Sequence, residues 1–411
     1  MNWNTKFSWS GLVAIPAWFL IPGFGCYLPN ALIVVLSICA AVGLAEMIWR
    51  RDRPCSPTPV IWTILALAGW AALSASWALD GGAAARGAAG LLGVAVILIM
   101  LWQANSYLSA QEKRWMSTAY LIGTFVAVAM LTVDIFSNAQ LAAWFRDYDN
   151  TDVLQNELAH RSLNRGITLL AFYMPVYILV AWRCTIPYLR PIALAVAAIA
   201  LVYCLNSGKD AIILAGAAAI LFAFLPFRPW RATRWLLIMG FCTYVAAIPF
   251  VTRLIPPPQV IWEEFRHFPP SLQHRLFIWS FTNQRIAEKP LLGWGMNSAK
   301  IIPGGDRDVT VGWGTGELQW RALPLHPHNA VLQWWLELGL VGALIATGGV
   351  AALISALWRQ SDPGKRMASA ACLGAALIVS LLSFGAWQSW WLAGMIIVAW
   401  MFKILDPLDQ A

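Results

Sequence analysis

Twelve stretches of this 411-residue chain are long and apolar enough to cross a lipid bilayer, and they constrain its fold more than any other feature. A membrane-spanning helix needs roughly 17–25 mostly apolar residues. The stretches lie near residues 9–24, 30–49, 58–78, 87–104, 116–137, 166–183, 190–205, 210–227, 234–252, 329–357, 367–386 and 388–405. Charged residues make up only 12% of the chain, about half of their share in ordinary soluble domains. The sequence therefore predicts an all-α, polytopic membrane protein with about twelve transmembrane helices, in which residues 1–411 form a single integral-membrane domain.

The distribution of basic residues predicts how these helices are oriented. With a cytoplasmic N-terminus, fifteen Lys and Arg residues fall in the short inside loops and tails, whereas the short outside loops hold only Arg86 and Lys209. Cytoplasmic loops of membrane proteins carry such an excess of positive charge. The first stretch contains Pro16 and Pro22 and lacks a small-residue cleavage site, so we expect a retained span rather than a signal peptide. Both termini are then cytoplasmic.

This topology leaves two long segments outside, residues 138–165 and 253–328. They hold eleven further basic residues, most of them Arg. A guanidinium group can bind a phosphate through two parallel hydrogen bonds, which a Lys ammonium cannot. The two segments therefore indicate a surface that binds an anionic ligand, the alternative being an ordinary solvated loop of mixed charge.

The segment His326–Asn329, which reads His-Pro-His-Asn, precedes the tenth apolar stretch. Pro327 stands where a helix would begin, because its missing N–H costs nothing there. Asn329, Gln333 and Glu337 then recur every four residues and form one polar stripe on an apolar helix. A Glu inside a membrane is expensive and marks a functional site by default. The alternative is an interfacial His cap with a Glu paired to a neighbouring helix.

Residues 271–295 predict an amphipathic helix on the outer membrane surface, stopped by Pro290 and presenting Arg275 and Arg285. Its expected apolar face carries Leu272, Leu276, Trp279 and Ile286. A plain surface helix is the alternative.

A third cluster lies at residues 160–166, where the sixth apolar stretch begins. Arg161 and Arg165 are four residues apart and could hold an anion together with the free N–H groups of a helix start. Their alternative role is to contact lipid phosphates. Lys209, in a short outside turn, could add one more cation.

Nucleotide, metal and cofactor sites have little support. The chain contains no GxxxxGK[ST] phosphate-binding loop. Asp306 and Asp308 could imitate a metal-binding carboxylate pair, but no α/β domain surrounds their Gly-rich loop. His326 and His328 have no third ligand spaced nearby, and a zinc site needs at least three protein ligands. We expect no metal, no cofactor and no nucleic-acid partner.

These motifs together resemble the bacterial O-antigen ligase and polymerase superfamily of integral-membrane glycosyltransferases. The resemblance covers the topology of the whole chain and, at motif level, residues 150–345. The motifs are Arg161, Ser207-Gly208-Lys209, Arg275…Trp279…Pro290-Leu-Leu-Gly293-Trp-Gly295 and His326-Pro-His328-Asn329…Glu337-x-Gly339-x-x-Gly342. The resemblance implies a GT-C-like fold in which the large loop, residues 253–328, contains short helices and catalytic elements.

The resemblance also implies a reaction. The donor is a glycan linked to undecaprenyl diphosphate, handled at the periplasmic side of the inner membrane among the membrane lipids. The acceptor of a ligase is a sugar hydroxyl of lipid A–core. His328 is expected to be the general base, with Asn329 or Glu337 orienting it or lining its site. The expected diphosphate-binding residues are Arg161, Arg275, Arg165, Arg266 and Lys209, with His326 and Arg285 as secondary residues.

Three related functions and one unrelated function remain open. A ligase is favoured by the single dominant loop, since polymerases often have two comparable outer loops with an Arg-x10-Gly pattern that neither long loop contains. The length of 411 residues argues against the longer relatives that modify proteins as O-oligosaccharyltransferases. A lipid-linked glycan transporter would usually show an internal repeat and charges near the membrane midplane.

Overall fold

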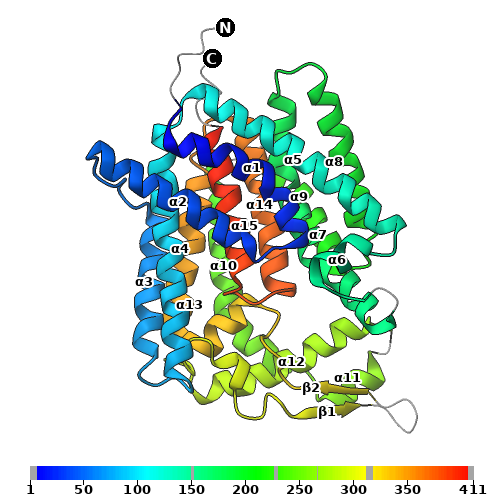
Figure 1. The fold of residues 1–411 in the computed structure, drawn as a ribbon. Helices are drawn as coiled ribbons and strands as arrows, with labels where there is room; N and C mark the ends of the chain where they lie inside the picture. The colour runs from blue at the N-terminus through cyan, green and yellow to red at the C-terminus, as the bar shows by residue number, and fades with distance from the viewer. Residues whose placement is uncertain (1–6, 150–151, 226–229, 266, 312–317, 406–411) are drawn as a thin grey trace.

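The computed structural model describes residues 7–149, 152–225, 230–265, 267–311 and 318–405. Every predicted apolar stretch forms a helix (Figure 1). The helices are α1 (Trp9–Tyr27), α2 (Ala31–Arg50), α3 (Pro59–Ser74), α4 (Gly81–Tyr107), α5 (Ala110–Phe136), α7 (Val153–Arg183), α8 (Leu189–Leu205), α9 (Asp210–Phe224), α10 (Trp230–Val251), α13 (Ala330–Leu357), α14 (Pro363–Leu382) and α15 (Ser389–Ile404). The prediction of an all-α membrane protein is thus confirmed at the level of fold class.

The number of spans is only partly supported. Within the described ranges, eight of these helices, α1, α2, α4, α5, α7, α10, α13 and α14, are long and apolar enough to cross a membrane. The other four, α3, α8, α9 and α15, are apolar but shorter than 18 residues. Twelve spans therefore remain a prediction.

The connecting elements gather at one end of the bundle, which we call the loop end. They are α6 (Gln140–Arg146), α11 (Pro258–Glu264), α12 (Pro270–Glu288), the 3₁₀ turns η2 (Thr252–Leu254) and η3 (Ser298–Ile301), and the strands β1 (Asp308–Val311) and β2 (Leu318–Arg321). In Figure 1, α11, α12, β1 and β2 lie opposite the end where α1 begins and α15 ends. The large loop therefore packs as one layer on the bundle.

The strand pair is an addition to the expected short helices. β1 and β2 are antiparallel, and Asp308 faces Arg321 across the pair. Opposite charges on facing strand positions stabilise such a ribbon modestly. The sequence around Asp308 did not predict that it would pair with Arg321 in a strand ribbon.

Two helix predictions at the loop end need correction. α7 begins at Val153 with Asp152 as its cap, so Arg161 and Arg165 lie inside the helix and not at its start. Helix α12 ends at Glu288, and its buried face differs from the expected one. The expected face is only half-buried except for Ile286, whereas Phe277, Ile278 and Phe281 are buried, because α12 packs on α13 and on the neighbouring loop. Its position on a membrane surface remains a prediction.

Helix α13 is interrupted at Gly339, whose φ of 64° is left-handed. The loop that follows α12 enters this break. Three carbonyls before the break accept hydrogen bonds from outside the helix: Leu336 from the Trp294 N–H (2.9 Å), Glu337 from the Gly295 N–H (2.8 Å) and Leu338 from Trp70 Nε1 (3.0 Å). Irregular backbone at membrane depth is tolerated only where its polar groups find such partners.

The amides beyond the break are satisfied in the same way. The Leu340 N–H donates to the Pro290 carbonyl at 2.9 Å, and the Val341 N–H to the Leu291 carbonyl at 3.5 Å. Gly293 and Gly339 lie face to face at this crossing, and a Cβ on either one would overlap the backbone of the opposite segment. Both positions therefore require glycine, because any larger residue would push the two segments apart.

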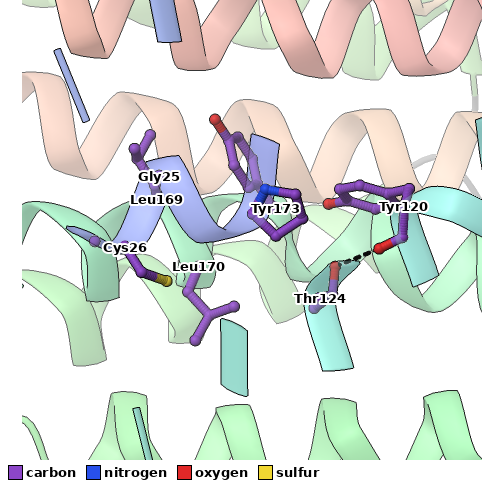
Figure 2. Close-up of a pocket in the computed structure, with 9 residues that line it drawn as sticks. Gly25, Cys26, Tyr120, Thr124, Leu169, Leu170 and Tyr173 are labelled. Carbon is purple, nitrogen blue, oxygen red and sulfur yellow. Dashed lines mark hydrogen bonds between the residues drawn. The ribbon is translucent and has the colours of Figure 1, made fainter. Parts of the chain in front are cut away.

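A small cavity lies between α1, α5 and α7 inside the bundle (Figure 2). Its polar contact is the Thr124 hydroxyl, which donates to the Tyr120 carbonyl at 2.8 Å. Gly166 allows α1 and α7 to lie close together, because a Cβ there would overlap the backbone of Cys26. The cavity is a packing feature of the helix bundle and holds none of the predicted site residues.

Candidate active site

The segment His326–Asn329 lies at the loop end directly before α13. Asn329 caps this helix, and its side-chain oxygen accepts the Leu332 N–H at 3.0 Å. Pro327 lies two residues before the cap and not in the first helical position as predicted. Its carbonyl accepts the Trp279 Nε1–H of α12 at 2.9 Å. The cap and this contact fix the segment between α12 and α13.

The ring of His328 is oriented by the connection between α14 and α15. His328 Nδ1 lies 2.6 Å from the Ser383 carbonyl oxygen. A carbonyl can only accept, so this contact assigns the proton to Nδ1. In the neutral ring, Nε2 then carries the free lone pair, which is the arrangement that a general base requires.

The electrostatic surroundings favour this neutral form. Burial lowers the pKa of His328 below its ordinary value of 6.5, and the positive charge of Arg275 lowers it further, as would a proton on His274. The hydrogen bond to the Ser383 carbonyl partly opposes the shift. At pH 7 the His328 imidazole is therefore unprotonated at Nε2 and able to take a proton.

The second histidine packs against the first. The ring centroids of His326 and His328 are 4.4 Å apart, and the His328 N–H donates to His326 Nδ1 at 3.2 Å. His326 is only 9% exposed. Burial lowers its pKa from 6.5 to about 3; a proton on His328 would oppose one on His326, and the positive charge of Lys300 adds to the shift. It is therefore neutral and can serve as a hydrogen-bond acceptor.

The polar stripe on α13 is present, but its hydrogen bonds do not go to His328. Asn329 Nδ2 donates to the Tyr244 hydroxyl of α10 at 2.8 Å. Gln333 Oε1 accepts the Ala386 N–H at 2.9 Å. The group that orients His328 is thus the Ser383 carbonyl, in place of the expected Asn329 or Glu337.

Glu337 connects three segments of the loop end. Its Oε1 accepts from Gln333 Nε2 at 3.0 Å, and its Oε2 accepts from the Asn297 N–H and from Trp387 Nε1, both at 2.8 Å. The side chain is 1% exposed. The geometry gives Glu337 a structural part, holding η3 and the α14–α15 connection together.

Cationic side chains surround the two histidines. Arg275 of α12 is close enough to lower the pKa of His328, and Lys300 does the same to His326. Arg275 Nη1 donates to the Ser271 carbonyl at 3.1 Å, while its buried Nε has no hydrogen-bond partner in the described part of the chain. Such positive charge suits an anionic ligand next to His328.

Arg165 reaches the same region from α7. Its guanidinium carbon lies 5.9 Å from the centre of the Trp390 ring. Trp390 Nε1 donates to Gln388 Oε1 at 2.7 Å, and Gln388 Nε2 is 3.3 Å from His326 Nε2. A short chain of contacts therefore connects Arg165 with the histidine pair.

The other predicted phosphate-binding residues are placed differently. Arg161 is 68% exposed and pairs with Glu157 at 2.9 Å. Arg285 pairs with Glu288 at 2.9 Å, and ten residues of helix separate it from Arg275, about 15 Å. Lys209 is exposed, next to Asp210, whose charge acts on Arg275. Arg266 lies outside the described residues.

Three residues of this region were missed by sequence reasoning: Ser383, Gln388 and Lys300. The first two belong to the connection between α14 and α15, which falls at the end of one predicted apolar stretch and the start of the next, and there Ser383, Gly385 and Gln388 interrupt the apolar pattern. That interruption was an available signal. The position of Lys300 beside His326 depends on the fold of the large loop and has no local signature.

No group of three His, Cys, Asp or Glu side chains that could hold a metal ion occurs among the described residues. His326 and His328 have each other and the α14–α15 connection as neighbours.

Comparisons with known proteins match the chain to polysaccharide ligases. Residues 194–347, from α8 into α13, match the family described as O-antigen ligase. A proposed polysaccharide ligase of Rickettsia bellii is 29% identical over 421 residues, which cover 95% of this chain and 97% of that protein. Another from Rickettsia conorii is 26% identical over 321 residues, covering 77% and 73%. A third, from Rickettsia felis, is 33% identical over 174 residues, 42% of each chain.

The apolar helices define the class: a helical, multi-pass membrane protein. More particularly, the chain is similar to polysaccharide ligases, because residues 194–347 match the O-antigen ligase family and 95% of the chain aligns with the Rickettsia bellii protein.

Proposed function

We propose that this protein is an O-antigen ligase that transfers a polysaccharide from undecaprenyl diphosphate to a sugar hydroxyl of lipid A–core. The observation that carries the proposal is the bond from His328 Nδ1 to the Ser383 carbonyl, which leaves Nε2 as a base among cationic side chains. The reaction takes place at the loop end, facing the periplasm, and needs no metal ion.

The proposed chemistry is a direct displacement. His328 Nε2 takes the proton of the acceptor hydroxyl as its oxygen attacks the anomeric carbon of the donor sugar. The bond from that carbon to the diphosphate breaks, and the anomeric centre is inverted. Arg275, Arg165 and Lys300 stabilise the negative charge that develops on the leaving diphosphate. No nucleotide is required, because the lipid-linked donor already carries its activation.

The test of the acceptor is deletion of the gene followed by gel electrophoresis of lipopolysaccharide. A ligase deletion is expected to leave bare lipid A–core, while lipid-linked polymer of normal length accumulates. A band of lipid A–core bearing one repeat unit, without accumulated polymer, would assign the protein as a polymerase. Transfer to proteins with unchanged lipopolysaccharide would assign it as an O-oligosaccharyltransferase.

The metal requirement is tested with purified protein, lipid-linked glycan and lipid A–core in detergent. Transfer is expected to survive EDTA. Activity that disappears with the chelator and returns with magnesium or manganese would contradict the proposed metal-free displacement and direct attention to Asp306 and Asp308.

The pH dependence of transfer follows from the lowered pKa of His328. The base must be neutral, so activity is lost only when the pH falls through its pKa. We therefore expect the acidic limb of the kcat/KM profile to lie below 6.5, the ordinary His value. This limb should be absent from the residual activity of a His328→Ala variant. An acidic midpoint clearly above 6.5 would contradict the assignment.

Replacing arginines with lysine tests which guanidinium groups contact the diphosphate. Arg275→Lys and Arg165→Lys are expected to lower kcat/KM by at least tenfold, because an ammonium group lacks the planar fork. Arg161→Lys should have a smaller effect, since Arg161 is exposed and paired with Glu157. Arg253→Lys, at an exposed position of the large loop, is the matched control. Unchanged activity of Arg275→Lys and Arg165→Lys would mean that a positive charge alone is enough at these positions, and an equal loss at all four would mean that the effect is not specific to the site.

A further inference from the structure

His328 has an unusual backbone conformation, with a φ of 53°. A residue with a Cβ reaches this left-handed region only at an energetic cost, so its surroundings must hold it there. Two hydrogen bonds act on His328: its N–H donates to His326 Nδ1 at 3.2 Å, and its ring Nδ1–H donates to the Ser383 carbonyl at 2.6 Å. The first fixes the backbone and the second fixes the ring.

We propose that His326 is a positioning residue, which holds the His328 backbone in the left-handed conformation by accepting its N–H, so that the His328 ring meets Ser383. This inference rests on the proposed function, in which His328 is the base. It gives the first histidine of the His-Pro-His-Asn segment a part that does not require contact with substrate.

The surroundings of His326 fit an acceptor whose ring cannot turn. The ring packs against Gly385, where a Cβ would come within 3.1 Å of His326 Cδ2. Because Nδ1 accepts, Nε2 carries the ring proton, so Gln388 Nε2, 3.3 Å from His326 Nε2 on the far side, is a packing neighbour and not a donor to the ring. The pKa of His326, about 3, keeps the ring neutral at physiological pH. A protonated ring would carry N–H groups on both nitrogens and could not accept the His328 N–H.

The consequence for His328 is a choice between two backbone conformations. With the His326 acceptor in place, the left-handed conformation satisfies the buried His328 N–H. Without it, that donor loses its partner, and the strain of the positive φ is no longer offset. Residue 328 then relaxes to an ordinary conformation, which moves its ring away from the Ser383 carbonyl. The base remains in the protein but leaves its working position.

Two substitutions separate the acceptor at Nδ1 from the rest of the ring. His326→Asn places an oxygen near the position of Nδ1 and keeps the acceptor, although it loses the contact with Gln388. His326→Gln places its polar atoms near the position of Nε2 and loses the acceptor. We expect the Asn variant to keep turnover within about threefold of the unchanged protein. The Gln variant should lose about 10–100-fold in kcat with little change in KM, the effect of leaving a buried donor unpaired.

The coupling to His328 distinguishes positioning from general damage. We combine His328→Ala with His326→Asn and, separately, with His326→Gln. The two double variants should have the same residual activity, because no base is left to position. Thermal unfolding in detergent is measured for each protein. If His326→Gln does not fold, His326→Leu replaces it, because Leu also lacks the acceptor. The Leu variant should show the same loss of kcat.

The outcomes are distinct. Equal activity of the Asn and Gln variants, or a further loss on the His328→Ala background, would overturn the positioning proposal while leaving His328 as the base. Full activity of His328→Ala itself would instead overturn the proposed function. The positioning proposal is supported if His326→Gln lowers kcat, if His326→Asn keeps it, and if neither change alters the residual activity of the His328→Ala protein.

Discussion

Replacing His328 with Ala is expected to lower turnover by about 10²–10⁴, the usual contribution of a general base. The physical reason is the tautomer set by the Ser383 carbonyl, which directs the free lone pair of Nε2 away from the α14–α15 connection. The substitution removes the hydrogen bond to Ser383 and the base together, but it leaves the Asn329 cap of α13 intact. KM for the lipid-linked donor should change much less than kcat.

The measurement is glycan transfer by purified protein at matched concentration, with the thermal unfolding midpoint recorded for each variant. His160→Ala is the matched control. His160 also lies near the loop end, but it is exposed and contacts Asn138 at 2.9 Å, away from the proposed site. Near-normal turnover of the His328→Ala protein, or an equal loss in both variants, would remove His328 from the chemistry.

The helical fold could be predicted because its signal is local. Each apolar stretch is long enough to identify a helix by itself, and all twelve appear in the structure. The polar stripe on α13 could also be predicted, from its four-residue spacing. Its hydrogen-bond partners could not, because Tyr244 and Ala386 are far from the stripe in the sequence.

The sequence predicted which residues form the candidate site, but only some of their contacts. His328 was found from its motif, whereas its orienting partner is a backbone carbonyl, which any residue type could supply. Arg161 and Arg165 looked equivalent as a pair four residues apart. The structure separates them: the charge of Arg161 is directed to Glu157, and that of Arg165 to Trp390. Such directions depend on tertiary packing and have no sequence signature.

Gly339→Ala is expected to destabilise the protein by about 3–5 kcal/mol, the range reached when strain is combined with broken buried hydrogen bonds. Gly339 has a φ of 64°, and a Cβ there would overlap the Leu291 carbonyl and press on Gly293. To make room, the loop must leave the break in α13. The carbonyls of Leu336 and Glu337, both in buried residues, would then lose their partners, and each buried polar group left unpaired costs about 1–3 kcal/mol.

Gly348→Ala is the control within the same helix. A Cβ at Gly348 meets no atom within 4 Å, and Ala is favoured over Gly in a helix interior by about 0.5–1 kcal/mol, so this change should leave stability equal or slightly raised. Thermal unfolding midpoints and size-exclusion profiles in detergent compare the two. Because the loop in the break also supplies the Asn297 N–H to Glu337, the Gly339 variant should lose transfer activity together with stability. An unchanged unfolding midpoint would mean that the loop does not hold the two halves of α13 together, and that the glycine spacing of the motif has a reason other than this crossing.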